Sequence, residues 1–147
     1  MSERAPPPER SSFAHFTPMT TRWMDNDVYG HVNNVQYYSW FDTAVNAWLI
    51  SRGLLDPATS PVIGLVAETR CRYFAPVSFP EAVEVGLAVS QLGRSSVTYA
   101  TGLFRAGQPQ ACAAGHFTHV YVQRATGRPI EIPPPIRDAL LRLKPKT

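Results

Sequence analysis

The chain is 147 residues long, 44% of its residues are hydrophobic, and 17% are charged. This length suits one domain with a sizeable core, and this composition excludes a disordered protein. No apolar run approaches the roughly 20 residues of a membrane span, and the first ten residues lack the apolar region of a secretory signal. We therefore expect a cytoplasmic protein without a membrane span. The two cysteines, Cys71 and Cys112, are too few for a disulfide framework or a zinc site.

The net charge of +3 is unevenly distributed along the chain. Residues 69–147 carry ten basic and four acidic side chains, which is a net charge of +6. Most of these bases are arginine, whose planar guanidinium is well shaped to hold phosphate. The bases form no continuous run, so the pattern predicts no nucleic-acid partner.

The N-terminal residues differ in composition from the rest. Residues 1–12 are rich in proline, serine and charge, and we expect a disordered tail there, followed by a single domain at 13–147. Residues 13–22 have the pattern of a first strand, in which Pro18 marks a bulge or an edge position.

A long helix follows the first strand. Asn33 or Asn34 can cap its start, and Gly53 can end it after Arg52. Apolar residues recur within it at three- and four-residue steps, which predicts a broad face packed in the core. These positions are Tyr37, Tyr38, Phe41, Ala44, Val45, Trp48 and Leu49.

The remainder reads as β structure divided by glycine and proline. We expect strands at residues 61–74, 83–89, 97–103 and 110–123, and a short amphipathic helix at 136–143. One long helix cannot cover both faces of a five-stranded antiparallel sheet, but it can fill the concave face of a curved one. The sequence therefore predicts an α+β fold whose other surfaces are buried by a second subunit.

The stretch between the first strand and the long helix carries the chemistry. It contains two carboxylates, Asp25 and Asp27, and then turns through Gly30 into the helix. A helix N-terminus offers unpaired N–H groups and a positive dipole, which suit a carbonyl oxygen that gains charge. Either aspartate can cap a turn or act as a catalytic carboxylate, and the residues alone do not choose between them.

Other catalytic and metal-binding patterns are missing from the sequence. His31 has no nucleophile-elbow sequence beside it, and no dinucleotide or phosphate-binding motif occurs. His116 and His119 are three residues apart in a predicted strand, so they point to opposite faces and cannot share a metal. We expect no metal and no cofactor. Acyl transfer to water is the reaction that the sequence can still support. It needs only a site for the carbonyl oxygen, a carboxylate and groups that bind the acyl carrier.

The sequence resembles the 4-hydroxybenzoyl-CoA thioesterase-like branch of the hotdog-fold acyl-CoA thioesterases. The resemblance extends from about residue 16 to residue 143 and is strongest in two segments. They read Arg22-Trp23-x-Asp25-x-Asp27-x-x-Gly30-His31-Val32-Asn33-Asn34-x-x-Tyr37 and Val120-Tyr121-Val122-x-x-x-Thr126-Gly127-Arg128-Pro129-Ile130-x-Ile132-Pro133. It implies a five-stranded antiparallel sheet wrapped around one long helix, and hydrolysis of an acyl-CoA to the free acid and CoA.

The resemblance also implies roles for individual residues. Asp27 would be the nucleophile or the general base, and the backbone N–H of Asn34 would hold the thioester carbonyl. Gly30 would let the loop turn tightly, while His31 and Asn33 would line the substrate site. Relatives specific for 4-hydroxybenzoyl carry other residues at the last two positions, which favours a fatty or other acyl group here.

The resemblance further implies partners. Two subunits would pair their sheets edge to edge, with the active sites at the dimer interface, and pairs would assemble into homotetramers. Coenzyme A would take part only as a portion of the substrate, its phosphates within reach of Arg70, Arg72, Arg94, Arg105 or Arg128. Two alternatives stay open: an acyl-carrier-protein thioesterase, and a non-catalytic acyl-CoA-binding module.

Overall fold

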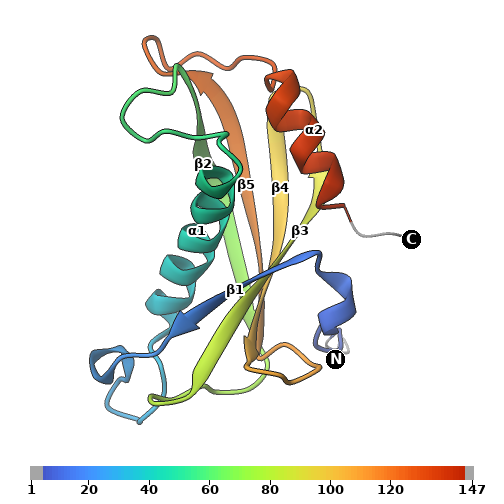
Figure 1. Ribbon diagram of the computed structural model, residues 1–147. Helices are drawn as coiled ribbons and strands as arrows, with labels where there is room; N and C mark the ends of the chain where they lie inside the picture. Colours follow the sequence, from blue (N-terminus) through green and yellow to red (C-terminus); the bar gives the residue numbers. More distant parts are fainter. Residues whose placement is uncertain (1–4, 145–147) are drawn as a thin grey trace.

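The computed structural model describes residues 5–144. Within this range the chain forms one five-stranded sheet, two α-helices and two short 3-10 helices (Figure 1). In chain order they are η1 (Arg10–Ser12), β1 (His15–Thr20), η2 (Trp23–Asp25), α1 (Asn34–Ser51), β2 (Val62–Tyr73), β3 (Ala82–Leu92), β4 (Ser96–Arg105), β5 (Ala113–Gln123) and α2 (Pro134–Arg142). The order of strands and helices predicted from the sequence is therefore confirmed, with shifts of a few residues at the ends.

The sheet is antiparallel throughout, with the strand order β1-β3-β4-β5-β2. Register shifts occur between Val66 and Glu68 in β2 and between Val89 and Gln91 in β3. Such bulges increase local twist and bend the strand that carries them. The sheet consequently curves around α1, as Figure 1 shows.

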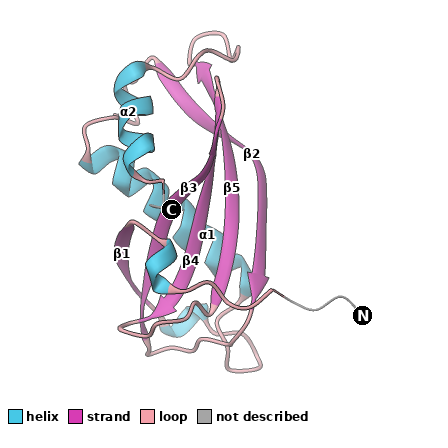
Figure 2. Ribbon diagram, turned by 90° about the vertical axis from the view of Figure 1, so that its right-hand side faces the viewer, coloured by secondary structure: helices cyan, strands magenta, loops and turns pink. Residues whose placement is uncertain are grey.

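The concave face of the sheet holds the core. The predicted apolar face of α1 lies here, and Phe41, Ala44 and Val45 are fully buried. The face is shared with α2, whose Ile136 and Leu140 join the same buried cluster as the C-terminal half of α1. The fold is thus a sheet wrapped around one long helix, with a second, shorter helix completing the cover (Figure 2).

The convex face is partly covered by the residues that precede β1. Phe13 packs edge-to-face against Phe16 and Phe104. A Cβ atom built on Gly86 or on Gly102 would come within 2.8 Å of the Phe13 ring. Glycine at both positions therefore lets the aromatic ring lie directly on the sheet.

The predicted disordered tail is wrong for its last residues. The N–H of Arg10 donates to the Pro109 carbonyl at 2.8 Å, and the N–H of Ala111 donates to the Pro8 carbonyl at 3.0 Å. The Arg10 guanidinium lies 2.5 Å from Glu84 and over two aromatic rings. Composition missed these contacts because most of their partners lie about 75 to 100 residues away. The rest of the predicted tail includes residues 1–4, which are outside the described range, and the 13–147 boundary stays a prediction.

Neither α-helix within residues 5–144 is long and apolar enough to cross a membrane.

Candidate active site

The two candidate carboxylates occupy different environments, although only Asn26 separates them in the chain. Asp25 ends η2 and its side chain is completely buried. It accepts hydrogen bonds from the backbone N–H of Arg22 at 2.7 Å and from Nε of the Arg22 guanidinium at 3.0 Å, and it forms an ion pair with Nη2 of the same guanidinium at 2.9 Å. Its backbone carbonyl accepts the N–H of Asn33 at 2.8 Å. Asp25 therefore ties the end of β1 to the start of α1.

Asp27 lies in a tight turn and is partly exposed. Its carbonyl accepts the N–H of Gly30 at 3.1 Å, and its N–H donates to the carbonyl of His31 at 2.8 Å. Gly30 has a φ of +80°, a conformation that favours glycine. One carboxylate oxygen, Oδ1, accepts the N–H of Tyr29 at 2.8 Å, which fixes the direction of the side chain.

The start of α1 faces the same space. Asn33 caps the helix, since its side chain accepts the N–H of Val35 at 3.0 Å and its carbonyl accepts the N–H of Gln36 at 3.0 Å. Among residues 5–144 the N–H of Asn34 has no hydrogen-bond acceptor. An uncapped N–H at a helix N-terminus is a suitable donor to a carbonyl oxygen.

A cavity of about 380 Å³ brings the turn and the helix start together. From the turn and α1 it is lined by Asp27, His31, Val32, Asn34 and Tyr37, and from the end of β2 and the loop that follows by Tyr73, Phe74, Ala75 and Pro76. The cavity thus contains a partly exposed carboxylate, a helix N-terminus and an apolar wall. These are the groups that hydrolysis of an acyl compound requires.

Two tyrosines of this cavity are held neutral. Burial, aided by the nearby Cys112 and Cys71, raises the pKa of Tyr37 to about 12. Burial also raises the pKa of Tyr73, whose hydroxyl donates to the Asn34 carbonyl at 3.5 Å. The two rings pack edge-to-face with their centroids 5.0 Å apart. Neither phenol is a candidate base near neutral pH, which leaves Asp27 and His31 as the polar groups of interest.

The structure brings only part of the predicted site to the cavity. Asp27, His31 and Asn34 line it, whereas Gly30 shapes the turn through its backbone and Asn33 caps the helix with its side chain. Gly30 is also held by the Ser78 hydroxyl, which donates to its carbonyl at 2.7 Å.

The wall formed by residues 73–76 was not predicted from the sequence. It is positioned by the pairing of β2 with β5 and by Arg105, whose guanidinium donates to the Pro76 carbonyl and forms an ion pair with Glu81 at 2.5 Å. No local sequence signal marks these contacts, because they connect separate strands. Arg105, one of the arginines expected to reach CoA, is already engaged by Glu81.

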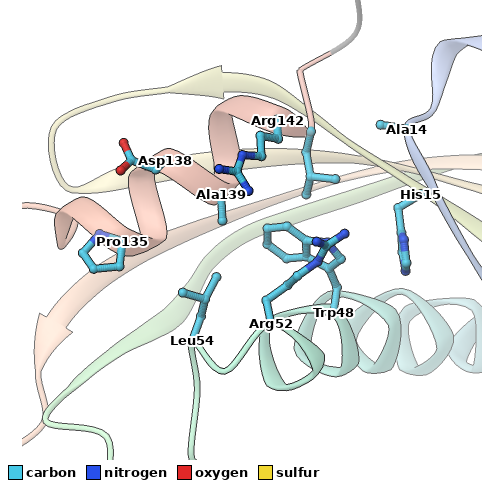
Figure 3. Close-up of a pocket in the computed structure, with 10 residues that line it drawn as sticks. Ala14, His15, Trp48, Arg52, Leu54, Pro135, Asp138, Ala139 and Arg142 are labelled. Atoms are coloured by element: carbon cyan, nitrogen blue, oxygen red, sulfur yellow. The ribbon is translucent and has the colours of Figure 1, made fainter.

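A larger cavity of about 490 Å³ lies near the other end of α1, between that helix and α2 (Figure 3). It contains no group positioned as a nucleophile beside a carbonyl site, so the smaller cavity at Asp27 is the better candidate for catalysis. Within residues 5–144, no three His, Cys, Asp or Glu side chains gather closely enough to hold a metal ion.

Comparison with known proteins decides the family. The model of the Thioesterase-like superfamily matches residues 21–140, a range that contains Asp27, the whole of α1 and the cavity wall. The chain belongs to the Thioesterase-like superfamily. As a member of this superfamily, it is assigned to thioester hydrolysis.

Known relatives extend over nearly the whole thioesterase-like chain. It is 56% identical to the PA5185 protein of Pseudomonas aeruginosa strain PAO1, with a TM-score of 0.93 over 97% of this chain and 99% of that one. It is 24% identical to YsmA of Bacillus subtilis strain 168 over 136 residues, which are 92% of this chain and 90% of that one.

A structural likeness also links this thioesterase-like chain to an enzyme of named substrate. Slr0204, a 1,4-dihydroxy-2-naphthoyl-CoA thioesterase from Synechocystis, is 19% identical, with a TM-score of 0.77 over 86% of this chain and 94% of that one. At this identity the likeness concerns the hotdog fold alone. The 4-hydroxybenzoyl-CoA branch named from sequence motifs stays a prediction.

Proposed function

We propose that the chain hydrolyses an acyl-CoA thioester to the free acid and CoA, with Asp27 as the general base or nucleophile. The observation that carries this proposal is the shared cavity, in which the Asp27 carboxylate and the uncapped N–H of Asn34 line one space. The named activity of Slr0204 on a CoA thioester gives the same substrate class for a protein of this fold.

In this mechanism the thioester carbonyl oxygen accepts the N–H of Asn34 at the start of α1. The helix dipole stabilises the negative charge that develops on that oxygen in the tetrahedral transition state. Asp27 either takes a proton from the attacking water or attacks the carbonyl carbon itself, after which water releases the acyl group. In both cases the C–S bond breaks and the sulfur leaves as the CoA thiol. The acyl group is released as the free acid, which takes one of its oxygens from water.

The apolar wall of the cavity would receive the acyl group. Tyr73 and Phe74 stand opposite the helix start, and the neutral tyrosine hydroxyls add no charge there. His31 lies at the rim beside Asp27, where it can hold the attacking water or the carboxylate. Gly30 and Asn33 contribute to substrate binding by keeping the turn and the helix cap in place.

Arg70 and Arg72 are the best candidates for holding the CoA phosphates. Both line a cavity of about 290 Å³ with His116, and Phe74 lines this cavity as well as the one at Asp27. Four ion pairs occur within residues 5–144, and none uses either arginine. Arginines without an acidic partner next to the substrate cavity suit a phosphate ligand.

The edge strand β2 supports assembly as a homodimer. It is twelve residues long, it ends the sheet, and it is largely exposed on both faces, including Leu65 and Val66. A long, exposed edge strand whose first half is apolar invites pairing with another strand. Because β2 ends at the wall of the Asp27 cavity, a partner paired along it would lie beside the active site. Homotetramers would form from two such dimers.

The decisive experiment measures thiol release from a panel of short, long and aromatic acyl-CoAs. We expect turnover by the wild type and a loss of a few orders of magnitude in kcat for Asp27→Asn. Asp56→Asn, in the exposed loop after α1, is a matched control that should keep full activity. Absence of thiol release from every substrate would overturn the proposal. A tight acyl-CoA complex without turnover would indicate the binding-module alternative instead.

The carrier is tested by presenting one acyl group on CoA, on pantetheine and on an acyl carrier protein. If Arg70 and Arg72 hold the CoA phosphates, Arg70→Gln/Arg72→Gln should raise KM for acyl-CoA and leave KM for acyl-pantetheine unchanged. Equal effects on both substrates would reject this role. Faster turnover of the carrier-linked substrate would favour the acyl-carrier-protein alternative.

A further inference from the structure

The larger cavity near the C-terminal end of α1 has the features of a separate ligand site. Its volume of about 490 Å³ falls in the range of small-molecule sites, roughly 300–1,000 Å³. Its lining includes His15, Trp48, Arg52, Asp138 and Arg142. Trp48 lies 14 residues beyond Asn34 in the same helix, which places this cavity roughly 20 Å from the proposed carbonyl site.

Two arginines bring positive charge to this cavity from different helices. Arg52 follows the last turn of α1, and Arg142 ends α2. Figure 3 shows both side chains reaching toward the space between the helices, while the Asp138 carboxylate points away from it. Within residues 5–144, no ion pair includes either arginine.

Interaction with the helix dipoles explains only part of this arrangement. A positive side chain near a helix C-terminus is favourable, and this applies to Arg52 and to Arg142 separately. Each guanidinium could satisfy the dipole while extending into solvent. The dipoles do not explain why two like charges lie on one cavity. A ligand with a negative charge would account for both.

The floor of the cavity is apolar. Trp48 forms part of it and is only 2% exposed. Leu54, Ala139 and Leu143 complete the apolar lining. At the far side, His15 has its pKa lowered by burial and by Arg52, so it stays neutral near pH 7. The cavity therefore combines an apolar floor with a rim whose positive charge comes from two guanidinium groups.

We infer that this cavity binds a carboxylic acid with an apolar body, with its carboxylate between Arg52 and Arg142 and its apolar part over Trp48. Guanidinium groups bind carboxylates through paired charge-assisted hydrogen bonds. A fully hydrophilic anion would gain no favourable contact from the apolar floor, so a ligand with an apolar body fits better. The source of such an acid follows from the proposed function, since hydrolysis of an acyl thioester releases one. The site itself is independent of catalysis.

The test uses decanoate and, as an uncharged ligand of equal chain length, decan-1-ol. Binding to the full-length protein is followed by calorimetry and by tryptophan fluorescence, to which Trp48 contributes. We expect Arg52→Gln/Arg142→Gln to weaken decanoate binding roughly tenfold, with a smaller loss for each single variant. Arg128→Gln, an exposed arginine in the turn after β5, is the matched control and should bind as the wild type does.

A crystal structure with 10-bromodecanoate locates the ligand directly. We expect the carboxylate between the two arginines and the bromine signal in the cavity beside Trp48. Equal decanoate affinity in the wild type and the double variant would overturn the inference, as would equal affinity for decanol or a bromine signal only in the Asp27 cavity. Binding of the free acid needs no turnover, so Asp27→Asn should retain the site. The two proposals can therefore fail separately. A protein without thioesterase activity can still bind decanoate in this cavity, and an active thioesterase can lack decanoate binding here.

Discussion

Replacing Asp25 and Asp27 separately by asparagine should show that Asp25 supports the stability of the fold and Asp27 supports the activity. The Asp25 side chain is completely buried, accepts two hydrogen bonds from Arg22 at 2.7 and 3.0 Å, and lies 2.9 Å from Nη2 of Arg22 in an ion pair. Asp27 is partly exposed and accepts one bond, from the N–H of Tyr29, which an asparagine oxygen can also accept. We therefore expect Asp25→Asn to destabilise the fold and Asp27→Asn to leave stability nearly unchanged.

The size of the effect at Asp25 follows from these contacts. Removing one partner of a buried ion pair costs about 3–5 kcal/mol. The Arg22 side chain is 56% exposed, so water can solvate its charge after the substitution, and asparagine keeps one acceptor oxygen. A loss of about 2 kcal/mol is the resulting expectation. For a domain of this size that lowers Tm by roughly 4–8 °C. For Asp27→Asn we expect less than about 0.5 kcal/mol.

The assay combines unfolding, followed by circular dichroism in heat and in urea, with thiol release at 25 °C. Asp25→Asn should unfold at the lower temperature and retain activity within about tenfold of the wild type while folded. Asp27→Asn should unfold as the wild type does and lose a few orders of magnitude in kcat. An unchanged Tm for Asp25→Asn, together with a large loss of activity, would refute the division and make Asp25 the catalytic candidate.

Two further predictions concern the β2 edge and the buried histidine. Leu65→Lys should convert the proposed dimer to a 16.3 kDa monomer in light scattering, because a charged edge opposes strand pairing. The control Leu141→Lys on α2, a residue with the same 49% exposure, should leave the mass unchanged. A dimer that survives Leu65→Lys would exclude this edge as the interface. Burial lowers the pKa of His119, so the unfolded chain binds a proton that the folded chain resists, and the free energy of unfolding should fall as pH drops below about 6.5. The pKa values of His15 and His116 are lowered as well, so they contribute to the same pH dependence. His119→Gln should reduce the slope of the free energy of unfolding against pH by at most about 1.4 kcal/mol per pH unit. An unchanged slope in this variant would contradict the prediction.

The strands and helices were predictable because their signals are local. Apolar spacing in the long helix, alternation in the strands and the Asn33 cap each depend on neighbours within about four residues. The opposite orientations of His116 and His119 followed from strand geometry in the same way, and the structure buries only His119. One half of the candidate site, the turn at Asp27 and the helix start at Asn34, could be located for this reason.

The other half of the site required the tertiary structure. The wall at Tyr73 and Phe74 reaches the helix start only through the pairing of β2 with β5 and the contact of Arg105 with the Pro76 carbonyl. The attachment of Arg10 to the loop near Pro109 spans about 100 residues and has no local signature. Composition predicted disorder there because it contains no information about distant partners.

The two aspartates show most clearly what could be predicted from the sequence and what could not. Their spacing established that a carboxylate stands just before a helix N-terminus, since the cap and the apolar stripe that identify the helix are short-range features. Only the tertiary structure assigned different surroundings to them, by burying Asp25 against Arg22 and by placing Asp27 in a cavity with Asn34. Burial depends on which distant segments pack around a side chain, and two acids separated by one residue carry no record of that packing.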